Sequence, residues 1–292
     1  NEIMGLAGLS GRAFLPLLLG FGCTVPAVMA ARILPDARDR RRTIFITPFM
    51  SCSAKLPVYV LFVEIFFPDR KLLVMSSLYA AGLGVGILMA FLIHRGEKEK
   101  ENPLLIELPQ YRMPGVKTVS IYVGDKIKDY LCKAGTTIFI AAIVLWFLLN
   151  TGVTGFVTDV SDSFAAMAGR MAEPFFRPCG LGNWRMTVAL LSGLSAKEVV
   201  VSSLSILYGI GNMNSPGGMA ELSGALAGEG FGCLNAYGML IFCLFYTPCV
   251  AAIGTVRKET GSIICAAGMA IFQFAMAWAA AALIYQIGSI LL

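Results

Sequence analysis

Long apolar stretches, separated by short polar ones, dominate the chain. Seven such stretches lie at about 13–34, 43–67, 71–95, 136–158, 184–208, 233–255 and 263–291. Most of them reach the length of about 20 residues that a helix needs to cross the hydrocarbon core of a bilayer. Apolar residues follow one another in these stretches without alternation, which excludes the strands of a membrane barrel. The pattern therefore predicts an all-α fold, a polytopic bundle of transmembrane helices.

Several of these stretches contain residues that interrupt a helix. Glycine or proline stands close to cysteine, serine or threonine in three places: Gly22, Cys23, Thr24 and Pro26; Pro48, Cys52, Ser53 and Pro57; and Pro248 and Cys249. An interrupted helix frees backbone carbonyl and amide groups, and a bilayer tolerates them only where a cavity or a ligand satisfies them. We therefore expect broken or re-entrant helices whose gaps face a polar space inside the bundle.

Two lysines, Lys55 and Lys197, each lie near the centre of an apolar stretch. A charged side chain at mid-membrane costs at least about 2.5–3.5 kcal/mol, so it faces a bundle interior, a cavity or a partner. Glu198 adjoins Lys197, and Ser195 lies three residues before Glu198 on the same helical face. A buried structural contact of each lysine with a glutamate or a carbonyl group is the alternative interpretation.

Short motifs recur in the two halves of the chain in reverse order. The recurring motifs are SAK at 53–55 and 195–197, and GCTVPA at 22–27 with its counterpart TPCVAA at 247–252. Many transporters build their substrate site where the broken helices of inverted repeats meet. We expect residues 1–95 and 136–292 to form such a repeat, with three and four apolar stretches respectively.

The polar stretch at 96–135 separates the two halves and is rich in lysine. Its apolar residues at 123, 127, 130 and 131 share one helical face, opposite the charged residues at 125, 126 and 129. This pattern predicts an amphipathic helix on the membrane surface, within a cytoplasmic loop. The connection at 35–42 is rich in arginine, and positive charge marks the cytoplasmic side. Two crossings separate the two basic loops, so both fall on the same side.

Charge also tests the topology of the second half. Counting crossings from the cytoplasmic loop places 209–232 inside, yet this loop is acidic and has no basic residue. An outside position follows if 184–208 dips into the membrane and returns, with a break around Ser192 and Gly193. An additional short crossing within 159–183 has the same effect. We favour the re-entrant or broken element.

Composition narrows the classes of function. Of the 292 residues, 57% are hydrophobic and 14% are charged, against about 25% charged in ordinary soluble domains. The net charge of +5 lies in the loops, so it indicates membrane orientation and no nucleic-acid partner. The P-loop pattern GxxxxGK[ST], the GxSxG elbow and the HExxH motif are absent from the sequence. We expect no enzymatic activity from these residues.

The interruptions offer a particular set of metal ligands. The chain has one histidine, His94, which excludes an iron or zinc site built from histidines. Backbone carbonyls and thiolates suit a borderline-soft divalent metal better than Mg²⁺ or Ca²⁺. The candidate metal ligands are Cys23, Cys52, Cys249 and Glu198, with Met50 assisting. The candidate gating or pathway residues are Thr24, Pro26, Ser53, Lys55, Ser195, Lys197 and Pro248.

Each of these cysteines also has a simpler interpretation as a small packing residue, because free cysteine is among the most buried residue types. Cys132, Cys243 and Cys265 are assigned to packing. Cys179 and Cys233 lie in or beside loops placed outside, where a disulfide between them stays an open alternative.

Five segments, spread in order over nearly the whole chain, resemble the membrane domain of the bacterial ferrous iron transport protein B family. They are GFGCTVPAVMAAR (20–32), PFMSCSAKLPVYV (48–60), ELPQYRMP (107–114), NWRMTVALLSGLSAKEVVVSSL (183–204) and YTPCVAAIGTVRKETG (246–261). The first and last are similar to the paired Gate elements of that family, which nucleoside-transporter-like membrane proteins share more distantly. The resemblance assigns proposed iron-pathway cysteines to Cys23 and Cys249, and it adds Cys52, Ser53 and Glu198 from the segments between them.

The resemblance implies uptake of Fe²⁺, as the transported substrate, across the bacterial cytoplasmic (inner) membrane. It also implies a cytoplasmic G domain that binds and hydrolyses GTP with Mg²⁺; this domain is missing here, so the chain looks like a C-terminal fragment. Small accessory proteins of the iron-uptake system and a homo-oligomer are the further partners expected, beside the lipid bilayer. The alternatives are a nucleoside or other small-molecule permease of the same architecture, and a non-transporting membrane scaffold.

Overall fold

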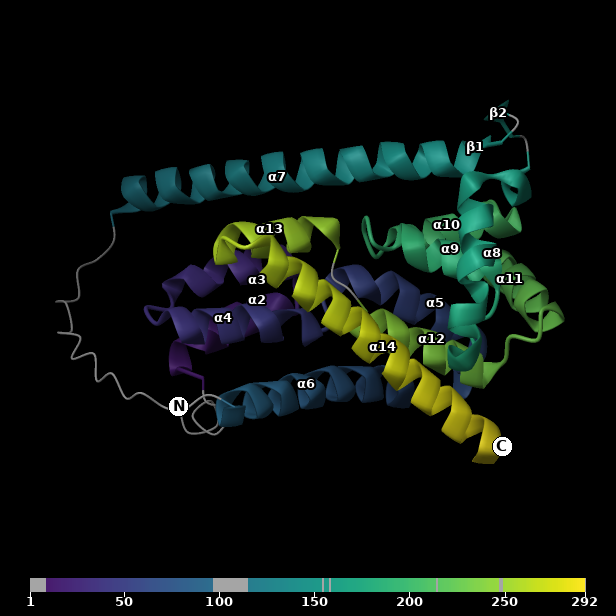
Figure 1. Ribbon diagram of the computed structural model, residues 1–292, viewed down its shortest axis with the longest axis horizontal. Coiled ribbons are helices and arrows are strands. Elements are labelled where there is room, and N and C mark those ends of the chain that lie inside the picture. Colours follow the sequence, from purple (N-terminus) through teal and green to yellow (C-terminus); the bar gives the residue numbers. More distant parts are fainter. Residues whose placement is uncertain are drawn as a thin grey trace.

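Helices make up almost all of the structure, a computed structural model that describes residues 9–96, 115–153, 155–157, 159–213, 215–246 and 249–291. Four helical stretches within these ranges are long and apolar enough to cross a membrane: Ala37–Phe66, Pro68–Arg95, Cys233–Thr260 and Ile263–Ile290. Two short strands, β1 (Thr151–Gly152) and β2 (Gly155–Phe156), pair in antiparallel fashion at one end of the molecule. The polytopic all-α bundle predicted from the hydrophobic pattern is confirmed (Figure 1).

The first half contains a helical hairpin followed by two crossings. Its helices, in chain order, are η1 (Gly11–Ala13), α2 (Phe14–Gly20), α3 (Thr24–Ala30), η2 (Ala31–Ile33), α4 (Ala37–Ile46), η3 (Thr47–Phe49), η4 (Ser53–Lys55), α5 (Leu56–Phe66), η5 (Pro68–Arg70) and α6 (Lys71–Gly96). The hairpin is α2 and α3: Leu9 and Ala13, at its start, share a hydrophobic cluster with Val28 and Ala31, at its end. The crossing from α4 to α5 is interrupted by two short 3-10 turns, whereas α6 is continuous.

The second half contains the same three kinds of element in the same order, with further helices before and between them. Its helices are η6 (Val160–Asp162), α8 (Phe164–Phe176), η7 (Arg177–Cys179), α9 (Trp184–Ser192), α10 (Val199–Tyr208), α11 (Pro216–Gly228), α12 (Cys233–Phe245), α13 (Val250–Thr260) and α14 (Ile263–Leu291). The hairpin is α9 and α10, the broken crossing is α12 and α13, and the continuous crossing is α14. In Figure 1, α4–α5 and α12–α13 run in opposite directions along the molecule, and so do α6 and α14. The inverted repeat therefore extends from short motifs to whole elements.

The second hairpin folds back on itself, so 184–208 does not cross as one helix. The side-chain amide of Asn183, at the start of α9, donates a hydrogen bond to the hydroxyl of Tyr208, at the end of α10, over 3.3 Å. Nearer the tip, the hydroxyl of Ser203 donates to that of Ser192 over 2.7 Å. Both ends of the hairpin lie on the same side of the molecule. This confirms the broken element that the charge of the following loop predicted.

One helix expected from the sequence has a different extent in the structure. Residues 123–131 are helical, but they form no separate surface helix, because they belong to α7 (Val116–Asn150), which continues into the stretch at 136–158. The helix lies along one flank of the bundle (Figure 1). Its charged first part and apolar second part stay one rod because the stretch holds no proline. Gly124 and Gly135 each weaken a helix by only about 1 kcal/mol.

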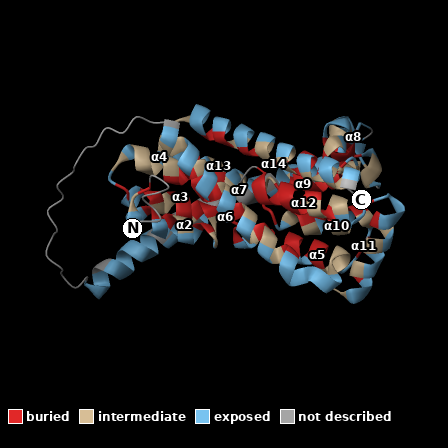
Figure 2. Ribbon diagram, turned by 90° about the horizontal axis from the view of Figure 1, so that it is seen from below, coloured by how far each residue is buried: buried red, intermediate tan, exposed pale blue. Residues whose placement is uncertain are grey.

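One shared core joins the two halves. Buried residues concentrate in the middle of the bundle, whereas α7 and the outer faces of α6 and α14 are exposed (Figure 2). Phe49 and Tyr59 from the first half belong to the same buried cluster as Phe242 and Phe245 from the second. The exposed outer faces carry many leucine, isoleucine and phenylalanine side chains, as expected of helices that are apolar all round and face lipid.

Candidate functional site

A cavity of about 240 Å³ lies where the interruptions of the two halves meet. Both hairpin tips and both broken crossings contribute to its lining. The lining residues are Gly22, Cys23, Thr24, Val25, Pro48, Cys52, Ser53, Ala54, Lys55, Ser195, Ala196, Lys197, Glu198, Tyr246, Cys249 and Ala251. The four candidate metal ligands and five of the candidate pathway residues therefore share one cavity, although they come from opposite ends of the chain.

The four candidate metal ligands occupy equivalent places in their helices. Cys23, Cys52 and Cys249 are the N-cap residues of α3, η4 and α13, and Glu198 is the N-cap residue of α10. Each one stands at the end of an interruption, directly before a new helical segment. The first amide groups of a helix give this end a partial positive charge, which favours negatively charged groups. Thiol and carboxylate groups therefore lie at the N-terminal ends of four helical segments.

Each hairpin tip is fastened to the broken crossing of its own half. In the first half, the backbone amide of Ser53 donates to the carbonyl oxygen of Gly22 over 3.1 Å, and the Ser53 hydroxyl donates to the same oxygen over 2.7 Å. In the second half, the backbone amide of Val250 donates to the carbonyl oxygen of Leu194 over 2.9 Å. These bonds use backbone groups that the interruptions set free, and they hold each tip against a break.

Lys55 caps the end of a helix that belongs to the other half. Its ammonium group donates to the carbonyl oxygen of Leu244 over 2.7 Å and to that of Met50 over 3.4 Å, and the residue is 4% exposed. Leu244 lies in the last turn of α12, where carbonyl groups have no partner within the helix. The contact is thus of the lysine–carbonyl kind. Glu64, the glutamate further along the same crossing, pairs with Lys71 instead.

Lys197 makes the corresponding contact from the tip of the second hairpin. Its ammonium nitrogen lies 2.8 Å from the centre of the Tyr246 ring and donates to the carbonyl oxygen of the same residue over 3.4 Å. A desolvated cation–π contact contributes about 2 kcal/mol or more. Tyr246 directly follows α12, whose C-terminal end carries partial negative charge. Two ammonium groups therefore cover this end of α12.

The cavity combines sulfur, hydroxyl and carboxylate groups with two ammonium groups. Within the part of the chain that the structure describes, no three side chains of histidine, cysteine, aspartate or glutamate lie close enough to hold a metal ion together. Structural metal sites are closed by four protein ligands.

Two residues named from the sequence, Pro26 and Met50, do not line this cavity in the structure. Pro26 stands in the first turn of α3 and lines another cavity, of about 420 Å³, between α3 and the first part of α7. Met50 packs its side chain against Gly20 and Gly86, so that side chain belongs to the core. Pro248 lies outside the described residues.

Cys179 and Cys233, for which the sequence allows a disulfide as an alternative, are separate free thiols in the structure. Cys179 donates to the carbonyl oxygen of Trp278 over 3.4 Å, and Cys233 donates to that of Phe66 over 3.5 Å. Burial raises the pKa of Cys179 to about 11. Cys179 is therefore a packing residue that stays protonated at neutral pH.

Tyr246 is the aromatic residue among the described lining residues, and the sequence did not single it out. It stands shortly before the proline and cysteine of the second interruption, so the sequence does show that it lies close to a helix break. An aromatic residue at such a place is normally assigned to the core. Its contact with Lys197 spans 49 positions of the chain, and no local pattern connects the two residues.

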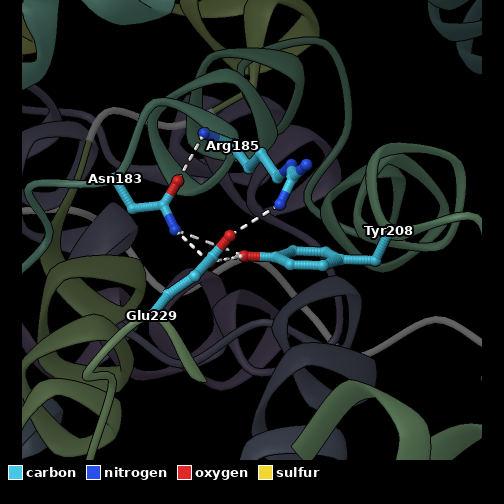
Figure 3. Close-up of polar contacts among 4 residues, drawn as sticks. All are labelled: Asn183, Arg185, Tyr208 and Glu229. Atoms are coloured by element: carbon cyan, nitrogen blue, oxygen red, sulfur yellow. Dashed lines mark hydrogen bonds and ion pairs between the residues drawn. The ribbon is translucent and has the colours of Figure 1, made fainter. Parts of the chain in front are cut away.

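A polar network closes the base of the second hairpin (Figure 3). The carboxylate of Glu229 accepts hydrogen bonds from Nη1 of Arg185 and from the Tyr208 hydroxyl, each over 2.6 Å, and from the side-chain amide of Asn183. The Arg185 guanidinium also stacks over the rings of Trp184 and Tyr208. The network joins the start of α9, the end of α10 and the residue after α11, so it fixes both ends of the hairpin.

An ion pair joins the two halves on the arginine-rich side of the bundle. Arg32, in η2 just after α3, donates through Nε to Oε2 of Glu259 over 2.6 Å, and a second nitrogen of its guanidinium pairs with the other carboxylate oxygen. Such bidentate pairs add geometric specificity to the attraction of charges. Glu259 lies in the last turn of α13. The helices that begin at the Cys23 and Cys249 caps are thus tied together near their far ends.

A family profile named Gate and described as "Nucleoside recognition" matches residues 1–66 and 131–263, more than half of the chain. The chain belongs to the Gate family. A second profile, described as "Ferrous iron transport protein B C terminus", matches residues 75–126 of the Gate chain. The resemblance to the membrane domain of ferrous iron transport protein B is confirmed by the two matches together with the relatives of the chain.

The relatives of this Gate chain carry names of iron transporters. It is 39% identical over 289 residues to the Fe(2+) transporter FeoB of Staphylococcus aureus (strain MSSA476), with 99% of the chain and 42% of the relative covered. It is 37% identical over 270 residues to the Fe(2+) transporter FeoB of Methanocaldococcus jannaschii, covering 89% and 39%. A Fe(2+) transport protein A/Fe(2+) transporter FeoB fusion protein of Porphyromonas gingivalis is 33% identical over 333 residues, covering 99% and 39%.

The Gate chain thus spans 42% of the Staphylococcus relative's length and 39% of the length of the other two. No solved structure matches it significantly.

Proposed function

We propose that this Gate chain is the permease part of an Fe²⁺ transporter, and that Fe²⁺ crosses the membrane through the cavity between the two halves. The observation that carries the proposal is the convergence of three N-cap cysteines, Cys23, Cys52 and Cys249, on this cavity. The relatives support it, because proteins similar to almost the whole chain are named Fe(2+) transporters.

In this proposal Fe²⁺ exchanges its water for sulfur, hydroxyl and backbone oxygen. Cys23 belongs to the first hairpin tip and Cys249 to the second broken crossing, so the ion passes between ligands of both halves. Glu198 supplies a carboxylate that offsets part of the ion's charge. Mixed soft and hard ligands suit a borderline divalent metal, and thiol ligands release protons when a metal binds.

The two lysines are proposed to control access to this route. Their ammonium groups lie on the carbonyl oxygens of Leu244 and Tyr246, at the kind of half-helix end that coordinates cations in other transporters. Their positive charge repels a second cation at short range, so a closed cavity excludes ions. Thr24, Ser53 and Ser195 offer hydroxyl groups along the wall.

The setting of the function belongs to the same proposal. The arginine-rich start of α4 would face the cytoplasm, and the membrane would be the bacterial cytoplasmic membrane. The relatives are more than twice as long as the matched region, which leaves length for a G domain that binds GTP and Mg²⁺. The fusion with Fe(2+) transport protein A in one relative supports a small accessory protein as a partner. A homo-oligomer stays a prediction.

Replacing Cys23 by serine in the full-length transporter tests this route. We expect Cys23→Ser to reduce the uptake of radioactive Fe²⁺ by cells at limiting iron by roughly tenfold or more, the scale on which changes around metal ligands act. Cys265→Ser, at an exposed cysteine of α14, is the matched control and should leave uptake unchanged. Unchanged uptake by Cys23→Ser would remove Cys23 from the ligands, and a wild-type protein without Fe²⁺ uptake would refute the function.

Nucleoside transport is the second candidate function, because the Gate profile carries that description. The cavity speaks against it: at about 240 Å³ it is smaller than the roughly 300–1,000 Å³ of typical small-molecule pockets. Its lining includes one aromatic ring, that of Tyr246, and neither asparagine nor glutamine to bind a base. An excess of uridine in the same uptake assay should therefore not compete with Fe²⁺.

A further inference from the structure

The Tyr246 ring lies between the second hairpin tip and the core. The Lys197 ammonium lies 2.8 Å from the ring centre. The ring stacks on Phe242, with 5.3 Å between centroids and 25° between planes. Tyr246 is 3% exposed. The ring is therefore fixed in place and presents its face to Lys197.

Hydrogen bonding by the hydroxyl group does not explain why a tyrosine occupies position 246. This hydroxyl is buried, and among the described residues it has no hydrogen-bond partner. It abuts Gly193 beyond the end of α9, where an added Cβ atom would come within 2.2 Å of the oxygen. What remains is the face of the ring, whose negative electrostatic potential attracts an ammonium group.

We propose that Tyr246 is a positioning residue for Fe²⁺ transport: its ring holds the Lys197 ammonium at the wall of the cavity, away from the ligands that receive the ion. This inference rests on the proposed function. Cys249 and Glu198 line the same cavity as Lys197, and Glu198 is the next residue in the chain. An ammonium group on a flexible four-carbon stem reaches ligands this close. Without the ring it keeps its backbone contact at residue 246 but loses the contact that fixes its position, and it then competes with the incoming cation for sulfur and carboxylate.

Replacing Tyr246 by leucine in the full-length protein tests this role. We expect Tyr246→Leu to raise the Fe²⁺ concentration for half-maximal uptake roughly tenfold, the scale set by one cation–π contact. The maximal rate should change little, because excess substrate overcomes a tethered competitor. Tyr246→Phe keeps the ring and removes only the hydroxyl, so it should retain the low half-saturating concentration that leucine loses. Tyr237→Phe lies within α12, which ends directly before Tyr246, and outside the cavity lining, so it controls for changes to α12.

A second substitution separates this role from a purely structural one. Lys197→Met removes the ammonium group, so adding Tyr246→Leu in that background should have no further effect on half-saturation. Uptake is normalised to the transporter present in the membrane, and anaerobic Fe²⁺ binding to the purified proteins gives the same comparison where uptake is weak.

Three results would overturn the proposal: wild-type half-saturation in Tyr246→Leu, a phenylalanine variant as defective as the leucine variant, or a leucine effect that persists in full beside Lys197→Met. A wild-type protein that takes up no Fe²⁺ would overturn the proposed function instead.

Discussion

At Gly193 the chain passes its neighbours too closely for any side chain. A Cβ atom there would lie 2.2 Å from the Tyr246 hydroxyl oxygen and 2.5 Å from a methyl carbon of Val200. Neither neighbour can easily give way, because both residues are buried and the Tyr246 ring is packed against Phe242. Glycine is therefore required where the end of α9 meets the end of α12.

We expect Gly193→Ala to lower the free energy of unfolding by about 1–3 kcal/mol, the usual cost of overpacking, and to lower the melting temperature of the purified protein. Gly254→Ala in α13 is the matched control, because an added Cβ there meets nothing within 4 Å. The control should be neutral or slightly stabilising, since alanine favours a helix. Equal melting temperatures of Gly193→Ala and the wild type would contradict this packing.

At the residue scale, the sequence allowed prediction of those cavity residues that are unusual in a membrane-spanning helix. A cysteine beside a proline and a lysine at mid-membrane are such departures, so Cys23, Cys249, Lys55 and Lys197 could be named. Their roles in transport stay predictions, because a position in a cavity tests no chemistry. Tyr246 follows an apolar stretch in which an aromatic residue is not unusual, so the sequence gives no reason to select it. Its contact with Lys197 exists only because the second hairpin folds against α12.

At the scale of elements, one carboxylate decides whether the second hairpin stays closed at its base. Glu229 accepts three hydrogen bonds, from Asn183, Arg185 and Tyr208. The side chains of Arg185 and Glu229 are 35% and 29% exposed, so each of these bonds contributes about 1 kcal/mol or less, below the value for a buried charged group. The base lies at the opposite end of the hairpin from Lys197, so a loosened base frees the tip that lines the cavity.

We expect Glu229→Gln to lower the free energy of unfolding by about 1–3 kcal/mol and to speed hydrogen–deuterium exchange in peptides from α9 and α10. The physical reason is that a neutral amide loses the charge that attracts Arg185 and offers one acceptor oxygen to three donors. Glu173→Gln is the matched control: it removes a pair with Arg177, whose side chain is 71% exposed. Exposed pairs contribute only about 0–1 kcal/mol. Similar exchange in the two variants would show that the network does not hold the hairpin.

The second hairpin could be predicted because charge contradicted a simple count of crossings in the loop that follows it. The continuity of α7 could not be predicted in the same way. A charged stretch followed by an apolar one has the pattern of two elements, one on the membrane surface and one within it. Whether they join depends on the absence of a helix breaker between them, which periodicity does not reveal.

At the scale of the whole molecule, the two halves share three kinds of element that run in opposite directions, and their motifs are exchanged. Each half has a hairpin, a broken crossing and a continuous crossing, but the first hairpin carries the cysteine motif and the second hairpin carries the lysine motif. Matching motifs therefore occupy different elements. The reversed order of the motifs could indicate an inverted repeat. It could not show that both motifs reach one cavity, which follows from hairpin tips and broken crossings meeting at the centre.

This architecture predicts on which side of the membrane each loop lies. A membrane-impermeant maleimide should label Gly211→Cys and Glu221→Cys in spheroplasts, above the background of the wild type. It should label Arg41→Cys only after permeabilisation, because positive charge keeps the start of α4 in the cytoplasm. Labelling of positions 211 and 41 from the same side would contradict a second hairpin that returns to the side it came from.

The length of α7 has a mechanical consequence. With 35 residues at 1.5 Å each it is about 50 Å long, and tilts of up to about 40° cannot hide that length in roughly 30 Å of hydrocarbon. Its polar end therefore extends beyond the hydrocarbon core of the membrane. Cavities of about 420 Å³ beside α3 and about 380 Å³ beside α9 and Ser195 lie along the helix, so α7 does not pack tightly against these helices over its whole length. In the proposed transport route, a displacement of that polar end would shift the wall that α3 and α9 form, without any contact at the cavity itself.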